Sequence, residues 1–181
     1  MTIIARKDGE KFENIEKTDF KLEKKLQKLI LDDQIMKKIK LGFEEDTTLV
    51  TLSRELESGS GPIDVLAIDE DGGIYIIETK LHDNHDRRKI LAQIMDYAGA
   101  MWNRFRDFKK FEEELERWNL RSKDNEILSG KSLSQIISNS TLGFTDKEDT
   151  DDIIRNMKEN FFSGKFKFIV VFDELDSKLI N

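Results

Sequence analysis

Two carboxylates and a lysine lie on neighbouring apolar segments, and together they have the composition of a phosphodiester-hydrolysing site. Asp64 lies in the run PIDVLAID, and Glu78 and Lys80 lie in the run IYIIETK. Because strand side chains alternate between faces, Glu78 and Lys80 share one face, roughly 6.6 Å apart. Neighbouring carboxylates repel each other unless a cation lies between them. Mg²⁺ binds a few carboxylates and keeps waters that phosphate oxygens can replace. Such an ion polarises the phosphoryl group and activates water, while Lys80 would orient or deprotonate that water or offset transition-state charge.

Whether these groups meet depends on the turn between the two runs. A three-residue turn over 70–72, with Gly72 in the left-handed conformation, places Asp64 directly opposite Glu78 on one face. A two-residue turn over 71–72 places Asp64 on the opposite face. We expect the three-residue turn. The plainer alternative for the charged groups is an ion pair between the lysine and one acid at the rim of the sheet.

The elements that must position these residues follow from apolar periodicity. A stripe of leucines and isoleucines predicts a helix over 19–40, and residues 86–105 carry a second such stripe that continues to Trp102, which we expect in the core. Further helices are expected over 106–121 after a break, 132–138 and 149–160. Strands are expected over 49–56, 63–69, 74–81 and 166–172.

Composition places limits on the class of protein. The chain has 181 residues, 38% hydrophobic and 37% charged, which fits one soluble domain over 1–181. It has no cysteine, which excludes disulfides and thiolate chemistry. Without an apolar signal or a membrane-spanning run, we expect a cytoplasmic location. The chain stops soon after the predicted strand over 166–172, so we expect either a minimal domain or a missing C-terminal region or domain.

Several other features of the sequence carry weaker functional signals. The net charge of −7 argues against a nucleic-acid partner, but a Mg²⁺ site needs carboxylates, and bound ions reverse the local field. His82 and His85 are interpreted as part of a solvated loop rather than a zinc site, because no further histidine or cysteine exists. The segment Gly59-Ser60-Gly61 lacks the lysine of a phosphate-binding loop and is interpreted as a turn or bulge.

The arrangement of Asp64 and then Glu78-Thr79-Lys80 on the next strand resembles the D…(D/E)xK motif of the PD-(D/E)XK nuclease superfamily. The following segment, ILAQIMDYAGAMW, carries Gln93 and Tyr97 as Q-x-x-x-Y, on one helical face. This motif is similar to that of the RecB-type subgroup and of archaeal NucS-like proteins. The proline, Pro62, is displaced from the Pro-Asp pair that gives the family its name.

The resemblance implies a fold and a set of roles. The implied fold is α/β, a restriction-endonuclease-like core with a mixed central sheet flanked by helices. It spans about 19–105, with 166–172 as a later core strand. Asp64, Glu78 and the Thr79 carbonyl would bind Mg²⁺ or Mn²⁺. Gln93 and Tyr97 would line the site, Glu23 would add the acid that the first helix often contributes, and Arg88 would contact a DNA phosphate.

Three functions were compared. The first is a metal-dependent deoxyribonuclease, in which cutting both strands of a duplex commonly needs two sites and hence a homodimer. The second is a catalytically silent domain of the same fold that binds nucleic acid or a protein. The third is a glycosidase-like enzyme with Asp64 and Glu78 as an acid and base pair, which the adjacent Lys80 and the few nearby aromatic residues disfavour.

Overall fold

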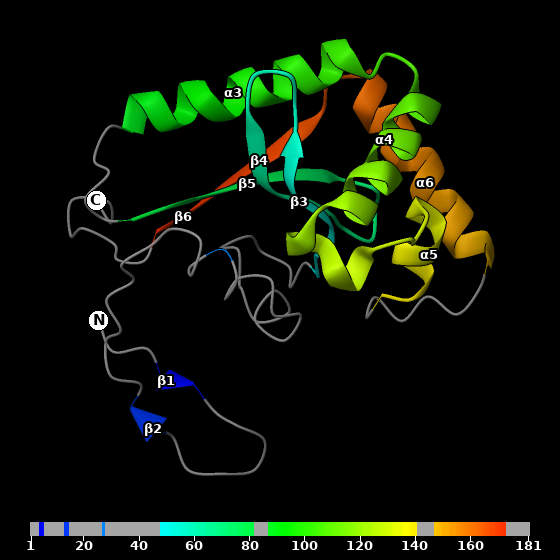
Figure 1. Ribbon diagram of the computed structural model, residues 1–181, viewed down its shortest axis with the longest axis horizontal. Helices are drawn as coiled ribbons and strands as arrows, with labels where there is room; N and C mark the ends of the chain where they lie inside the picture. The colour runs from blue at the N-terminus through cyan, green and yellow to red at the C-terminus, as the bar shows by residue number, and fades with distance from the viewer. Residues whose placement is uncertain are drawn as a thin grey trace.

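The computed structural model describes residues 48–81, 87–140 and 147–172, the segments 4–5 and 13–14, and residue 27. The main body is α/β, with a four-stranded mixed sheet flanked by helices (Figure 1). Its strands are β3 (Val50–Glu57), β4 (Pro62–Ile68), β5 (Ile74–Lys80) and β6 (Phe166–Phe172). Its helices are α3 (Arg87–Arg104), α4 (Phe108–Arg121), the 3-10 helix η1 (Lys123–Leu128), α5 (Leu133–Ser138) and α6 (Lys147–Phe162). Separately, β1 (Ile4–Ala5) and β2 (Glu13–Asn14) pair antiparallel.

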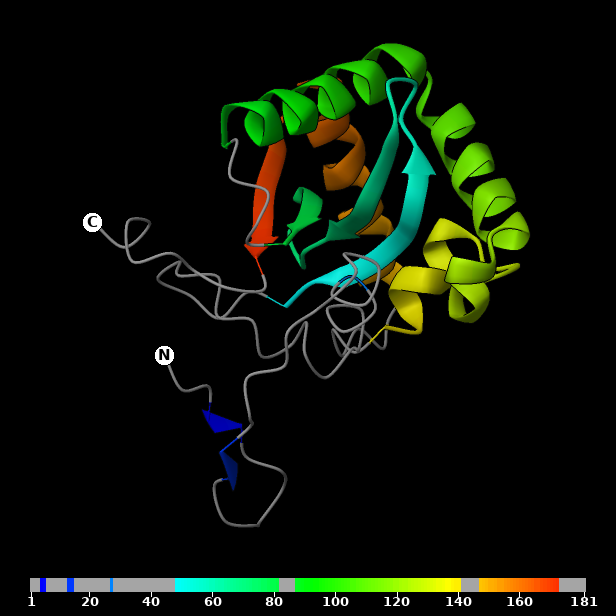
Figure 2. The ribbon, with the colours of Figure 1, turned by 60° about the vertical axis from the view of Figure 1, so that its left-hand side comes forward.

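The order of strands in the sheet is β3-β4-β5-β6. Strands β3, β4 and β5 are antiparallel neighbours, and β6 pairs parallel to β5 (Figure 2). Among the described residues β6 pairs only with β5, so it is an edge strand. The long connection between β5 and β6 contains α3 to α6, as a parallel pairing requires.

The β4–β5 register confirms the predicted three-residue turn. Pairing runs from Ile68 with Ile74 to Val65 with Ile77. The amide of Asp69 donates to the Gly73 carbonyl at 3.0 Å, and Gly72 has φ +77°, the left-handed conformation that such a turn requires. If this register is continued by one residue pair beyond Val65 and Ile77, Asp64 lies opposite Glu78.

The helices match most of the predicted ranges. The break after α3 falls at 105–107, where the Asp107 carboxylate accepts from the Lys109 amide and caps α4. The predicted helix over 19–40, with Glu23, and the loop containing His82 and His85 lie outside the described residues, apart from Gln27, which is helical. No helix in the described ranges is long and apolar enough to cross a bilayer.

The expectation that Trp102 is a core residue was wrong. Its side chain is 41% exposed. The buried stripe of α3 passes through Met101, and one further residue rotates the side chain by about 100° onto the flank of the helix. There the indole N–H donates to the Phe162 carbonyl at 3.3 Å.

The main core lies between the sheet and the helices that cover one of its faces. Aromatic rings fill much of it: the Phe111 ring centroid is 5.6 Å from that of Phe105, 5.5 Å from Phe108 and 5.2 Å from Phe161. The opposite face of the sheet carries a smaller buried cluster, made of Leu49, Val65, Ala67, Tyr75 and Ile77. Both faces of β4 and β5 are therefore buried, and their polar residues must find partners within the protein.

Candidate active site

Asp64 lies where β4 separates from β5. In a continued antiparallel ladder, the Thr79 amide would donate to the Ile63 carbonyl. Instead it donates to Asp64 Oδ2 at 2.7 Å, and the Thr79 hydroxyl donates to the same oxygen at 2.7 Å. The Asp64 carboxylate thus replaces a backbone acceptor at the point where the two strands diverge.

The distortion continues into β3. Glu55 would pair with Asp64, but it has φ +52° and is the one described non-glycine residue with positive φ. Regular pairing with β4 resumes on either side, at Arg54 and at Leu56. The left-handed residue of β3 therefore lies opposite Asp64, at the position where β4 leaves β5.

Glu78 is the most buried acid of the cluster, with an exposed fraction of 1%. Its Oε1 atom is 2.7 Å from Lys80 Nζ, and it also accepts from Gln93 Nε2 at 2.9 Å. A buried carboxylate requires such charged and hydrogen-bonding partners. The Lys80 side chain is 13% exposed, so its ammonium lies between the buried carboxylate and solvent.

Gln93 and Tyr97 connect α3 to this carboxylate. They lie one helical turn apart, and Gln93 Nε2 donates to the Tyr97 hydroxyl at 2.5 Å. Burial raises the pKa of the Tyr97 phenol above its ordinary value; the negative charges of Glu78 and Asp64 raise it further, while the Gln93 hydrogen bond and Lys80 lower it. The phenol is therefore protonated at neutral pH.

The β3–β4 turn closes over the Tyr97 ring. The Ser58 amide donates to the Gly61 carbonyl at 3.0 Å, which confirms the turn predicted at this segment. Gly61 has φ +147°, and a Cβ atom there would lie 2.9 Å from Tyr97 Cε1. Arg104 holds the turn from the other side, donating from Nη1 to the Glu57 carbonyl at 2.7 Å.

The structure thus brings together five of the predicted site residues: Asp64, Glu78, Lys80, Gln93 and Tyr97. Thr79 also binds Asp64 through its amide and hydroxyl, and the metal-binding role of its carbonyl stays a prediction. Arg88 is exposed in the first turn of α3, five residues before Gln93. The sequence does not predict the hydrogen bond from the Thr79 hydroxyl to Asp64 or the packing of Gly61 against Tyr97, although both residues lie in segments discussed above.

The two carboxylates fit a hard divalent cation. Within the described ranges, no group of three or more acidic, histidine or cysteine side chains forms a ready metal cage. Mg²⁺ does not need one, since it is commonly held by one or two carboxylates and retains several waters. Asp64 uses only Oδ2 toward Thr79, and no hydrogen bond to its Oδ1 occurs among the described residues. Continuing the β4–β5 register by one pair beyond Val65 and Ile77 places the two acidic residues opposite each other.

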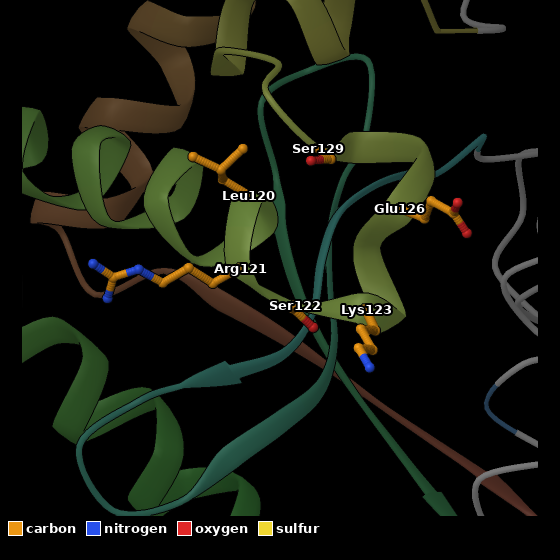
Figure 3. A pocket seen from close by; sticks show the side chains of 6 residues that line it. All are labelled: Leu120, Arg121, Ser122, Lys123, Glu126 and Ser129. Carbon is orange, nitrogen blue, oxygen red and sulfur yellow. The ribbon is translucent and has the colours of Figure 1, made fainter.

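Two hollows elsewhere were compared with this cluster. One, of about 360 Å³, lies over the end of α4 and η1 and is lined by Leu120, Arg121, Ser122, Lys123, Glu126 and Ser129 (Figure 3). The other, of about 280 Å³, is lined by Trp102, Arg106, Phe161 and Phe162. Neither contains a carboxylate pair or a residue of the cluster around Glu78. The candidate site therefore rests on the arrangement of its side chains.

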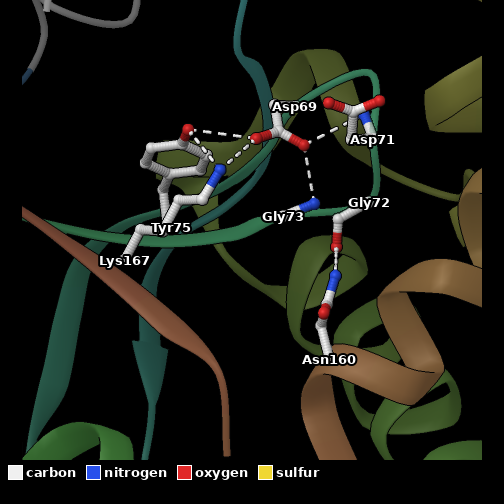
Figure 4. A network of polar contacts seen from close by, with 7 residues as sticks. All are labelled: Asp69, Asp71, Gly72, Gly73, Tyr75, Asn160 and Lys167. Atoms are coloured by element: carbon white, nitrogen blue, oxygen red, sulfur yellow. Dashed lines mark hydrogen bonds and ion pairs between the residues drawn. The ribbon is translucent and has the colours of Figure 1, made fainter. Parts of the chain in front are cut away.

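A second polar network lies at the turn end of the β4–β5 hairpin (Figure 4). The buried Asp69 carboxylate accepts from the Asp71 amide at 3.0 Å and the Gly73 amide at 2.6 Å through Oδ1. Through Oδ2 it accepts from the Tyr75 hydroxyl at 3.0 Å and from Lys167 Nζ at 2.7 Å. This network ties β6 to the turn and fixes the register that sets Asp64 opposite Glu78.

No protein-family model, curated protein or solved structure matches this chain. What the protein does is therefore inferred from the chemistry of the cluster itself.

Proposed function

We propose that this protein is a metal-dependent nuclease that hydrolyses DNA phosphodiester bonds at the cluster around Glu78. The observation that carries the proposal is the convergence on one buried carboxylate: Glu78 accepts from both Lys80 and Gln93. Asp64 lies one residue beyond the last β4–β5 pair, at the position opposite Glu78 when the register is continued. An ordinary rim ion pair would explain the lysine. It would not explain the glutamine from a separate helix or the second acid.

The fold supports the same proposal at a coarser level. Three antiparallel strands, a helix on one face and a later strand parallel to β5 follow one another in the order expected of a restriction-endonuclease-like core. Function is nevertheless argued from the site, because one fold supports many activities.

In the proposed reaction, Asp64, Glu78 and the Thr79 carbonyl would hold Mg²⁺ or Mn²⁺. When bound, the ion would supply Lewis acidity and an activated water. Thr79 orients Asp64 through its two hydrogen bonds, and Gln93 orients Glu78. Tyr97, protonated at neutral pH, holds the Gln93 amide in place. Lys80, which lies within hydrogen-bond distance of Glu78, would orient the attacking water and offset negative charge in the transition state.

The substrate would approach from the solvent side of Lys80. Arg88 is exposed near the start of α3 and would contact a backbone phosphate. Phosphate contacts of this kind set affinity rather than sequence preference, and they weaken as salt concentration rises.

The experiment is a cleavage assay on labelled single-stranded, duplex and branched DNA, with Mn²⁺ or with EDTA. The wild type should cleave only with metal, and Glu78→Ala should reduce the rate by at least about a hundredfold, as loss of a key transition-state group does. Glu116→Ala, at an exposed acid on α4, is the matched control and should cleave normally. A folded wild type that neither cleaves DNA nor binds Mn²⁺ in calorimetry would contradict the proposal and favour a catalytically silent binding domain.

A further inference from the structure

Exposed apolar side chains occur on β6, at the end of α6 that leads to it, and on α3. Seven large apolar residues of the described chain are notably exposed, and five of them lie on these three elements. Phe168 on β6 is 43% exposed, and Phe162 at the end of α6 is 45% exposed. The other three lie on α3: Leu91 at 56%, Met95 at 65% and Trp102 at 41%.

The three α3 residues form one stripe. At about 100° per residue, Leu91, Met95 and Trp102 point within about 40° of one another. Gln93 and Tyr97 point to the opposite flank, toward Glu78 and the β3–β4 turn. The Trp102 indole bonds to the Phe162 carbonyl, which joins the stripe to the α6–β6 connection. The apolar surface is therefore separate from the candidate active site.

Strand β6 lacks the features that usually protect an edge. Natural edge strands carry outward charges, prolines or bulges that block pairing with another chain. The sequence of β6, FKFIVVF, has seven residues, no proline and one charge, and its pairing with β5 is regular throughout. That charge, Lys167, is bound to Asp69 at 2.7 Å rather than directed along the edge.

We propose that β6 pairs antiparallel with β6 of a second copy, so that the two sheets join across a two-fold axis at Ile169. The strand is self-complementary in this register. Phe166 lies opposite the partner's Phe172, and Phe168 lies opposite the partner's Val170. Ile169 lies opposite its own symmetry mate. Lys167 is the one charged residue of β6, and the aliphatic part of its side chain would lie opposite Val171 of the partner subunit.

The exposed apolar side chains supply about half of the surface that such a dimer needs. The five exposed apolar side chains amount to on the order of 400 Å², since a large aromatic side chain carries roughly 200 Å². A stable interface buries about 800 Å² on each partner. The paired edges of β6, whose residues are mostly half-buried, supply the remainder. Pairing would also give partners to the outward backbone N–H and C=O groups of β6, beside which no other strand lies among the described residues.

The absence of cysteine from the chain makes disulfide trapping a direct test. Directly paired residues have Cα atoms about 4.5–5.5 Å apart, within the range that a disulfide spans. Ile169→Cys should therefore form a covalent dimer under mild oxidation at micromolar concentration. Ile127→Cys, at a residue that is 82% exposed on η1, is the control and should remain monomeric.

Light scattering on the wild type completes the test. It should give twice the chain mass of 21.1 kDa, and Phe168→Glu should return the mass to that of one chain with its circular dichroism unchanged. A wild type that stays at one chain mass at 100 µM would overturn the proposal. So would a dimer that Ile169→Cys traps no faster than Ile127→Cys, because the interface would then lie elsewhere.

Discussion

Asp69 holds the β4–β5 turn through one buried carboxylate, so replacing it should destabilise the protein in a graded way. The carboxylate is 2% exposed and accepts four hydrogen bonds, two from backbone amides and two from side chains. Asp69→Ala removes every acceptor and leaves the buried Gly73 amide without a partner. Asp69→Asn keeps an oxygen for the two amides and loses the charge that binds Lys167.

The magnitude follows from the partners. A neutral hydrogen bond contributes about 1 kcal/mol, and a buried donor left without a partner costs about 1–3 kcal/mol. The Lys167 side chain is 54% exposed, so water screens its ion pair, which should contribute no more than about 1 kcal/mol. We expect Asp69→Ala to lower the free energy of unfolding by about 3 kcal/mol, and Asp69→Asn by about 1 kcal/mol.

Urea denaturation at pH 7 measures both variants. The midpoint should fall without a change in the m-value, since the variants alter stability rather than the surface exposed on unfolding. If Asp69→Ala stays within about 0.5 kcal/mol of the wild type, as an ordinary surface substitution does, the network does not hold the turn. The explanation of the hairpin register would then be wrong.

Two further predictions concern packing and pH. Gly61→Ala should lower the free energy of unfolding by about 1–3 kcal/mol, because the new Cβ would lie 2.9 Å from Tyr97 Cε1 and the residue has φ +147°. The control Gly99→Ala, whose Cβ would meet no atom within 4 Å, should instead stabilise α3 by about 0.5–1 kcal/mol. Equal changes in the free energy of unfolding for the two variants, measured by urea denaturation, would contradict this prediction. Burial raises the pKa of the Tyr75 phenol. Burial alone would lower the pKa of Lys167, but the hydrogen bonds from its ammonium to Asp69 and Tyr75 have the larger effect, so the pKa of Lys167 is also raised. Both groups hold their protons more tightly when folded, so their contribution is complete below about pH 10 and is lost as pH rises through the raised values. The free energy of unfolding, measured from pH 9 to 12, should fall less steeply with pH in Asp69→Ala than in the wild type. Equal slopes for the two proteins would contradict the proposed link between Asp69 and the raised pKa values.

The parts of the fold that depend on local signals could be predicted from the sequence. The apolar runs that form β4 and β5 located both strands, and Gly72 after two acidic residues predicted the turn between them. The spacing of Gln93 and Tyr97 predicted that both would reach one side of α3. These signals need only strand and helix periodicity, which tertiary packing here preserves.

Other features depend on contacts between distant segments. The hydrogen bonds from Thr79 to Asp64 require β4 to separate from β5, which the left-handed Glu55 on β3 accompanies. No pattern in the sequence marks a left-handed glutamate within a strand. Trp102 continues an apolar run after Met101, which favours a core position, but the neighbouring α6, rather than periodicity, determines what covers that flank.

The most direct test of the proposed nuclease is the rate of Mn²⁺-dependent DNA cleavage by Lys80→Ala, compared with Lys165→Ala at an exposed lysine before β6. Lys80 is the charged partner of the buried Glu78, so circular dichroism and urea denaturation must first show that both variants are folded under the assay conditions. The proposal predicts normal cleavage by Lys165→Ala and a loss of at least about a hundredfold in Lys80→Ala, from removal of a group that acts on the transition state. Cleavage by Lys80→Ala at the wild-type rate would contradict it.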